Sequence, residues 1–295
     1  LINVAGPQMQ VATGDFNADT IPDLIALDNA NDRLSMRTGD GTGGFGYVSP
    51  VSFPSAAYLF RFAAGDFNGD DRDDIVLLDW SQIYVYLTNT MGELGTPATI
   101  ALPATPDGAN EVALADVDQQ DGLDIVIGTY DTGHIVTFYN DGSGGFSAAD
   151  THEFYNTGSD SSDGTNFMAF ADLNQDDTLD LVADNVDAGV TAVHLGTGSG
   201  VSPFNTGTTV NVQGGGGFAL ADLDTDCAPD LIADDSGTVK IYPNRNDQSG
   251  TFMAPTNLGF SGSARAIASG DFNGDGVLDV AVSTSTSISV FHSDP

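Results

Sequence analysis

Short runs of apolar residues, separated by polar turns, fill this chain in a recurring order. A run of small and apolar residues, such as 218–221, leads into an acidic loop, and a wholly apolar run, such as 24–27, leaves it. A third run alternates, as in 83–87, and a Gly-rich turn then leads to a fourth run, as in 208–212. Short alternating or wholly apolar runs bounded by turn residues are typical of β-strands. The pattern predicts four strands in each unit.

The same unit occurs six times. Its acidic phrase reads GDFNADTIPDLI from Gly14, GDFNGDDRDDIV from Gly65, ADVDQQDGLDIV from Ala115, ADLNQDDTLDLV from Ala171, ADLDTDCAPDLI from Ala221 and GDFNGDGVLDVA from Gly270. The leading aspartates are 49–56 residues apart, close to the roughly 40–50 residues of a four-stranded propeller blade. The repeats predict an all-β protein, a six-bladed β-propeller of four-stranded antiparallel blades that forms one domain over residues 1–295.

The two ends of the chain predict how the ring closes. The sixth copy stops after its third run, and Leu1–Phe16 aligns without a gap with Asn257–Phe272. Leu1–Val4 therefore take the position of a fourth strand. We expect them to complete the last blade and to pair its open edge. The alternative is an open solenoid of hairpins.

Each acidic loop places oxygen-bearing side chains at its first, third, fifth and ninth residues. This spacing lets a tightly curled backbone point them at one ion. Carboxylate and amide oxygens suit calcium better than zinc or a redox metal, so we expect about six calcium ions. An EF-hand would place Glu at position 12, where these loops have Ala, Leu, Ile or Val. Gln120 replaces an acid in the third loop, and solvated Asp-rich turns are the alternative. The predicted ligands are Asp15, Asn17, Asp19, Asp23, Asp66, Asn68, Asp70, Asp74, Asp116, Asp118, Gln120, Asp124, Asp172, Asn174, Asp176, Asp180, Asp222, Asp224, Asp226, Asp230, Asp271, Asn273, Asp275 and Asp279.

These repeats resemble the FG-GAP/VCBS repeats that form the propellers of integrin α-subunits and of many bacterial secreted proteins. The likeness lies in the DFNxDxxxD loop and in the later turns Gly43–Gly46 and Gly144–Phe146, and it covers essentially the whole chain. It implies that the six ligand sets bind calcium. Integrin propellers usually have seven blades and only some calcium loops, so the resemblance implies no particular partner.

Charge and composition narrow the partners. The formal charge is −35 with only seven Lys and Arg residues, and such a surface repels nucleic acid and anionic membranes. No run reaches the roughly 18 apolar residues of a membrane span. The single cysteine, Cys227, excludes an intrachain disulfide, which leaves metal to staple the fold. We expect an extracellular protein, secreted or at the cell surface.

A ligand would use the face away from the metal loops. The candidate side chains there are Tyr58, Arg61, Trp80, Tyr130, His134 and Tyr155. Trp80, the only tryptophan, is either a partner anchor or a packing residue. No nucleophile with its base stands out, and the four histidines are scattered, so we expect no enzyme. The leading hypothesis is a recognition or adhesion module for an extracellular protein or glycan. A calcium-dependent lectin, a self-assembling unit of a filament or surface layer, and a polysaccharide-active enzyme are the alternatives.

Overall fold

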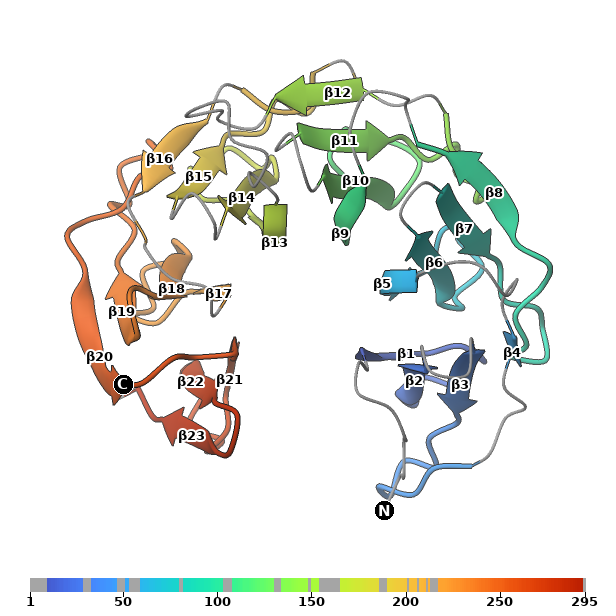
Figure 1. Ribbon diagram of the computed structural model, residues 1–295, viewed down its shortest axis with the longest axis horizontal. Helices are drawn as coiled ribbons and strands as arrows, with labels where there is room; N and C mark the ends of the chain where they lie inside the picture. Colours follow the sequence, from blue (N-terminus) through green and yellow to red (C-terminus); the bar gives the residue numbers. More distant parts are fainter. Residues whose placement is uncertain are drawn as a thin grey trace. The chain divides into compact units, whose positions relative to one another are not determined.

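All regular structure in the described part of the chain is β-strand. The computed structural model describes residues 10–28, 33–46, 51–52, 59–79, 82–102, 108–129, 134–147, 150–153, 165–185, 190–200, 202–205, 207–210, 212 and 217–293. Within these ranges 23 strands form six antiparallel sheets and no helix occurs (Figure 1). The prediction of an all-β protein is confirmed.

The sheets follow the six repeats in sequence order. The first contains β1 (Val11–Gly14), β2 (Asp23–Asp28), β3 (Arg33–Arg37) and β4 (Val51–Ser52), and the second β5 (Leu59–Gly65), β6 (Asp74–Asp79), β7 (Gln82–Tyr86) and β8 (Ala98–Ala101). The third contains β9 (Ala109–Ala115), β10 (Asp124–Thr129), β11 (His134–Phe138) and β12 (Asp150–Glu153), and the fourth β13 (Thr165–Ala171), β14 (Asp180–Asn185), β15 (Val190–His194) and β16 (Thr208–Val210). The fifth contains β17 (Phe218–Ala221), β18 (Asp230–Asp234), β19 (Thr238–Tyr242) and β20 (Thr256–Ser261).

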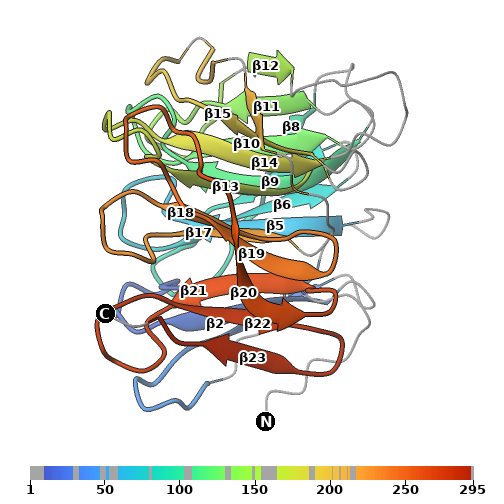
Figure 2. The same cartoon turned by 90° about the vertical axis from the view of Figure 1, so that its left-hand side faces the viewer.

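The sixth sheet has three strands among the described residues. These are β21 (Ala266–Gly270), β22 (Asp279–Ser283) and β23 (Ile288–Phe291), which Figure 2 shows as neighbouring strands. Leu1–Val4, expected to complete this sheet, lie outside the described residues. Six sheets of up to four antiparallel strands are what the repeats predict, and ring closure by Leu1–Val4 stays a prediction.

Burial explains the different composition of the strands. The second strand of a sheet lies between two others, and all six residues of β6, Asp-Ile-Val-Leu-Leu-Asp, are buried. The third strand alternates buried and partly exposed residues in β3, whereas in β7 and β11 every residue after the first is buried. The continuous apolar run of β6 therefore marks a strand covered on both faces, and the alternation in β3 marks a strand covered on one. The run 83–87, predicted to alternate, is instead buried at residues 83–86.

The chain divides into two compact units. One contains Leu1–Asp116, Gln120–Ile127 and Val136–Ala149, and the other Val117–Gln119, Gly128–Ile135 and Asp150–Pro295. In the first unit, Phe16, Phe62 and Ile75 belong to one buried cluster. In the second, Leu173, Leu231 and Tyr242 belong to another. In the first four loops the aromatic or aliphatic residue after the leading aspartate, such as Phe16 or Leu173, is buried and anchors that loop to the core. In the last two loops Leu223 is half-buried and Phe272 is exposed.

Candidate metal-binding loops

The ninth residue of every loop is a buried aspartate that begins the second strand of its sheet. In five loops its Oδ2 accepts the backbone N–H of the loop's second residue at 2.8–3.2 Å. In all six, Oδ1 accepts a backbone N–H from just beyond the third strand at 2.7–2.9 Å. This carboxylate therefore ties the start of the loop to the turn that follows the third strand.

The leading aspartate of each loop lies in a curl of backbone N–H groups. Asp15 accepts the N–H of Asp19 at 3.1 Å and that of Thr20 at 2.7 Å. Ala18 and Thr20 have positive φ, and the fourth and sixth residues do so in every loop, although only three of these twelve are glycine. Alternating conformations of this kind turn successive N–H groups toward one side, which suits an anion. These hydrogen bonds hold the leading carboxylate in place within the loop.

Burial and repulsion between acids raise the pKa of four ninth aspartates, Asp23, Asp74, Asp180 and Asp230. The pKa of Asp279 is lowered instead, because hydrogen bonds from His292 and from backbone N–H groups outweigh its burial. The pKa of Asp74, Asp180 and Asp230 rises to about 6, first because burial penalises the charged form and also because other acids of the same loop lie close by. Backbone N–H donors lower it in part. A bound cation would offset the cost of burying these charged carboxylates side by side, since it favours the charged form of each ligand.

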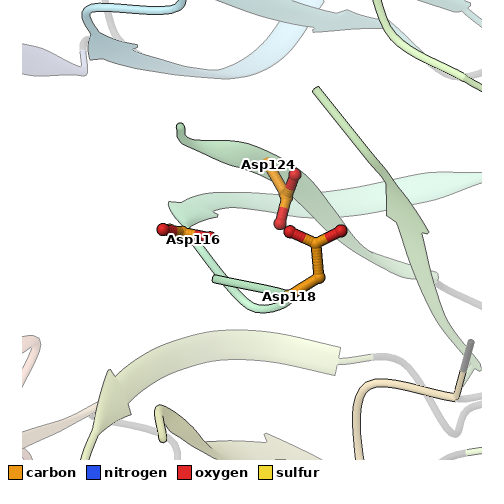
Figure 3. Close-up of side chains that lie close together, drawn as sticks. All are labelled: Asp116, Asp118 and Asp124. Carbon is orange, nitrogen blue, oxygen red and sulfur yellow. The ribbon is translucent and has the colours of Figure 1, made fainter. Parts of the chain in front are cut away.

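Two loops bring three acids close enough to share one ion. Oxygens of Asp116, Asp118 and Asp124 lie within 4.8 Å of one another, as do those of Asp222, Asp224 and Asp226. Figure 3 shows the carboxylates of Asp118 and Asp124 near each other, one on the loop and one on the strand that follows. The third loop therefore converges although Gln120 replaces an acid. All its donors are oxygens, the set that hard cations such as calcium prefer.

The predicted ligand face is only partly described. Tyr58, Trp80, Tyr130 and Tyr155 lie outside the described residues. Arg61 on β5 pairs with Glu111 on β9, with 2.8 Å between Nε and Oε2. The backbone N–H of His134 donates to Thr129 Oγ1 at 2.9 Å.

A cavity in the second unit was not predicted. It measures about 340 Å³ and has apolar walls from Val193, Val210, Phe252, Met253 and Pro255. Tyr242 and Asp235 also line it. Asp235 Oδ2 accepts the Tyr242 hydroxyl at 3.0 Å and lies 2.6 Å from Lys240 Nζ. The cavity is lined by segments that are up to 62 residues apart in the sequence, so no local sequence motif predicts it.

The FG-GAP-like repeat family matches residues 15–77, 66–122 and 222–282, more than half of the chain. This chain belongs to that family. The matched segments include four of the acidic loops described above, and the family confirms the resemblance drawn from the repeats. No curated protein matches the chain.

Solved structures with the same fold share little sequence with this FG-GAP-like protein. An Agrocybe aegerita lectin, described as recognising non-reducing terminal N-acetylglucosamine, has a TM-score of 0.68 at 19% identity over 97% of this chain and 80% of its own. BBS1N, solved in complex with ARL6DN, has a TM-score of 0.62 at 13% identity and covers 95% of this chain and 78% of its own. The periplasmic gluconolactonase of Pseudomonas aeruginosa has a TM-score of 0.62 at 12% identity and covers 95% of this chain and 73% of its own. These likenesses show a propeller fold built of repeats.

The gluconolactonase corrects one prediction. We expected no enzyme, and this exclusion is wrong, because an enzyme has the same propeller fold. At 12% identity the likeness concerns the fold alone, and it assigns no catalytic residue to this chain.

The described residues include no helix long and apolar enough to cross a membrane.

Proposed function

We propose that this protein is an extracellular, calcium-loaded propeller that recognises a glycan. Calcium binding is supported by the recurrence of one arrangement: a nested leading aspartate, a buried ninth aspartate and oxygen donors between them. The acids of two loops converge within 4.8 Å. Calcium accepts six to eight oxygen ligands in flexible geometry, which suits loops that differ in their third and fifth residues. Bound calcium would neutralise carboxylates that otherwise repel one another.

The same chemistry supports the extracellular location. Calcium sites of extracellular modules have dissociation constants of about 10⁻⁴–10⁻³ M. Loops of such weak affinity are filled only where calcium is abundant, as it is outside the cell. With Cys227 as the single cysteine, the fold has no intrachain disulfide, so metal would supply its cross-links. Each site saturated at about 100 times its Kd adds about 2.7 kcal/mol to the free energy of unfolding.

The cavity in the second unit is the observation that carries glycan recognition. Its volume of about 340 Å³ lies at the lower end of the range for small-ligand sites, about 300–1,000 Å³. Apolar walls suit the C–H faces of a sugar ring, and Asp235 offers a carboxylate to its hydroxyls. Lys240 balances the charge of that carboxylate, which favours a neutral ligand over a cation. The Agrocybe aegerita lectin, whose fold is similar, recognises a terminal sugar.

Three measurements test the proposal. Native mass spectrometry would count about six calcium ions, and the melting temperature would fall when a chelator is added. A glycan array in calcium would then reveal the ligand. Thr208→Trp on β16 fills the cavity that Thr208 lines and should abolish binding.

Ala98→Trp on β8 is the matched control. Ala98 is exposed and pairs with Val85 as Thr208 pairs with Val193, so the substitution takes the same register position in another sheet. Binding should survive it. An array without any bound glycan, or equal binding by the Thr208→Trp variant and the natural protein, would refute the glycan assignment.

A further inference from the structure

Two consecutive loops of the second unit, 172–180 and 222–230, are connected by a side chain that is not a predicted ligand. Gln175 is the fourth residue of its loop, exposed and with a φ of 59°. Its Nε2 donates to Asn246 Oδ1 at 2.8 Å and lies 3.5 Å from the carbonyl oxygen of Cys227, the sixth residue of the next loop. One glutamine thus reaches from one candidate calcium site to the next.

Asn246 continues this connection to a predicted ligand. Its Nδ2 donates to the backbone carbonyl of Asp226 and to Asp226 Oδ2, both at 3.0 Å. Asp226 is one of the three acids whose oxygens converge in the fifth loop. The orientation of this carboxylate therefore depends on Asn246, which in turn is held by Gln175.

A second connection joins the same two loops through the backbone. Asn244 Nδ2 donates to the carbonyl oxygen of Leu173 at 3.0 Å, and the Asn244 N–H donates to Asp230 Oδ1 at 2.8 Å. The Leu173 N–H donates to Asp180 Oδ2 at 2.8 Å. The ninth aspartates of both loops are thus attached to one short chain of hydrogen bonds.

The glutamine contact occurs one repeat earlier as well. Gln119, the fourth residue of its loop, donates from Nε2 to the carbonyl oxygen of Asp177 at 2.6 Å. The N–H of the same peptide group, on Thr178, donates to Asp176 Oδ1 at 2.9 Å. In both cases the glutamine reaches the sixth residue of the following loop, next to a predicted ligand.

We propose that Gln175 is a positioning residue that couples calcium binding in loop 172–180 to calcium binding in loop 222–230. This inference rests on the proposed calcium function. An ion in the first loop fixes Asn174 and Asp176 on either side of Gln175, so the glutamine and Asn246 become ordered. Asp226 is then held near its ligand position before the second ion arrives, and the second ion loses less conformational entropy on binding. The two ions bind with positive cooperativity.

Cys227 allows one loop to be observed separately from the others. It is exposed, it is the only cysteine of the chain, and it lies inside loop 222–230. The rate at which a thiol reagent modifies it, measured against free calcium concentration, gives a midpoint for this loop alone. Asp176→Asn weakens the preceding loop. The midpoint is compared in four proteins: the natural chain, Asp176→Asn, Gln175→Met and the double variant.

Coupling is measured as the shift caused by Asp176→Asn. In the natural chain the midpoint should rise by about tenfold, within the usual range of coupling between sites, and in the Gln175→Met background it should rise by less than about twofold. Asn246→Ala should have the same effect as Gln175→Met, because it breaks the connection at its other end. Gln248→Met is the matched control, since Gln248 is also exposed with a φ of 64°, and it should leave the tenfold shift intact.

The outcomes separate this inference from the proposal on which it rests. If mass spectrometry counts no calcium and the rate of Cys227 modification ignores it, the calcium proposal itself fails. If calcium binds and the modification rate responds to it, Asp176→Asn could still shift the midpoint equally in the natural chain and in the Gln175→Met variant. That result would refute the coupling while calcium binding stands.

Discussion

Asp180 has two roles in the structure, and they can be separated by mutation. It is fully buried and accepts the N–H groups of Leu173 at 2.8 Å and Gly196 at 2.7 Å. It is also a predicted calcium ligand. Asp180→Ala removes both acceptors at once. A buried donor without a partner costs about 1–3 kcal/mol, so two such donors cost about 2–6 kcal/mol.

Part of this cost is offset. The pKa of Asp180 is raised to about 6 by burial, so at neutral pH its charge is unfavourable and the alanine variant is relieved of it. We therefore expect a net loss near the lower end, about 2 kcal/mol in the free energy of unfolding. Asp180→Asn keeps one acceptor oxygen and should lose less.

Urea unfolding in chelator and in calcium measures the two roles. Asp180→Ala should lower the midpoint in chelator without changing the slope, and it should lower it further in calcium. Asp176→Ala is the control from the same loop. Asp176 accepts the Thr178 N–H but is exposed, so water can replace it as the acceptor, and its variant should stay close to the natural protein in chelator and fall behind only in calcium. An unchanged midpoint for Asp180→Ala in chelator would show that its two hydrogen bonds do not brace the loop.

Three further predictions concern pH, backbone strain and the cavity. Burial raises the folded-state pKa of Asp74, Asp180 and Asp230 above the ordinary 3.8 to about 6, so the metal-free protein should gain stability as pH falls through about 6 toward 4. The calcium-loaded protein should lose stability over the same pH range, since protonation expels the ion. Melting temperatures that change in parallel with and without calcium would contradict this expectation. Thr20 has a φ of 65°, so Thr20→Gly should stabilise the protein by about 1 kcal/mol in urea unfolding, and a destabilised variant would refute the strain. Tyr242→Phe leaves Asp235 without the hydroxyl that it accepts at 3.0 Å and should weaken binding of any glycan found on the array by roughly tenfold, whereas an unchanged Kd would place the ligand elsewhere.

The repeats were enough to predict the strands, the family and the residues of the six loops. Periodic apolar runs specify strands because side chains alternate between the faces of a sheet, and the acidic phrase carries its own local geometry. The glycine at Gly276 suggests a positive φ at the sixth residue of a loop. The same conformation at Thr20 or Cys227 has no signal in those residues taken alone, and it becomes evident only when the loops are aligned.

Which distant residues meet depends on tertiary packing. The N–H of Gly196 reaches Asp180 because the second and third strands of one sheet pair in a particular register. The bridge from Gln175 to Asn246 and the cavity beside Tyr242 join segments of neighbouring repeats, so they depend on how one sheet packs against the next. Neither the strand register nor the packing of one sheet against the next can be predicted from the acidic loop motif. Each loop can therefore be read from the chain as a ligand set, whereas the connection between consecutive loops arises only when their sheets pack together.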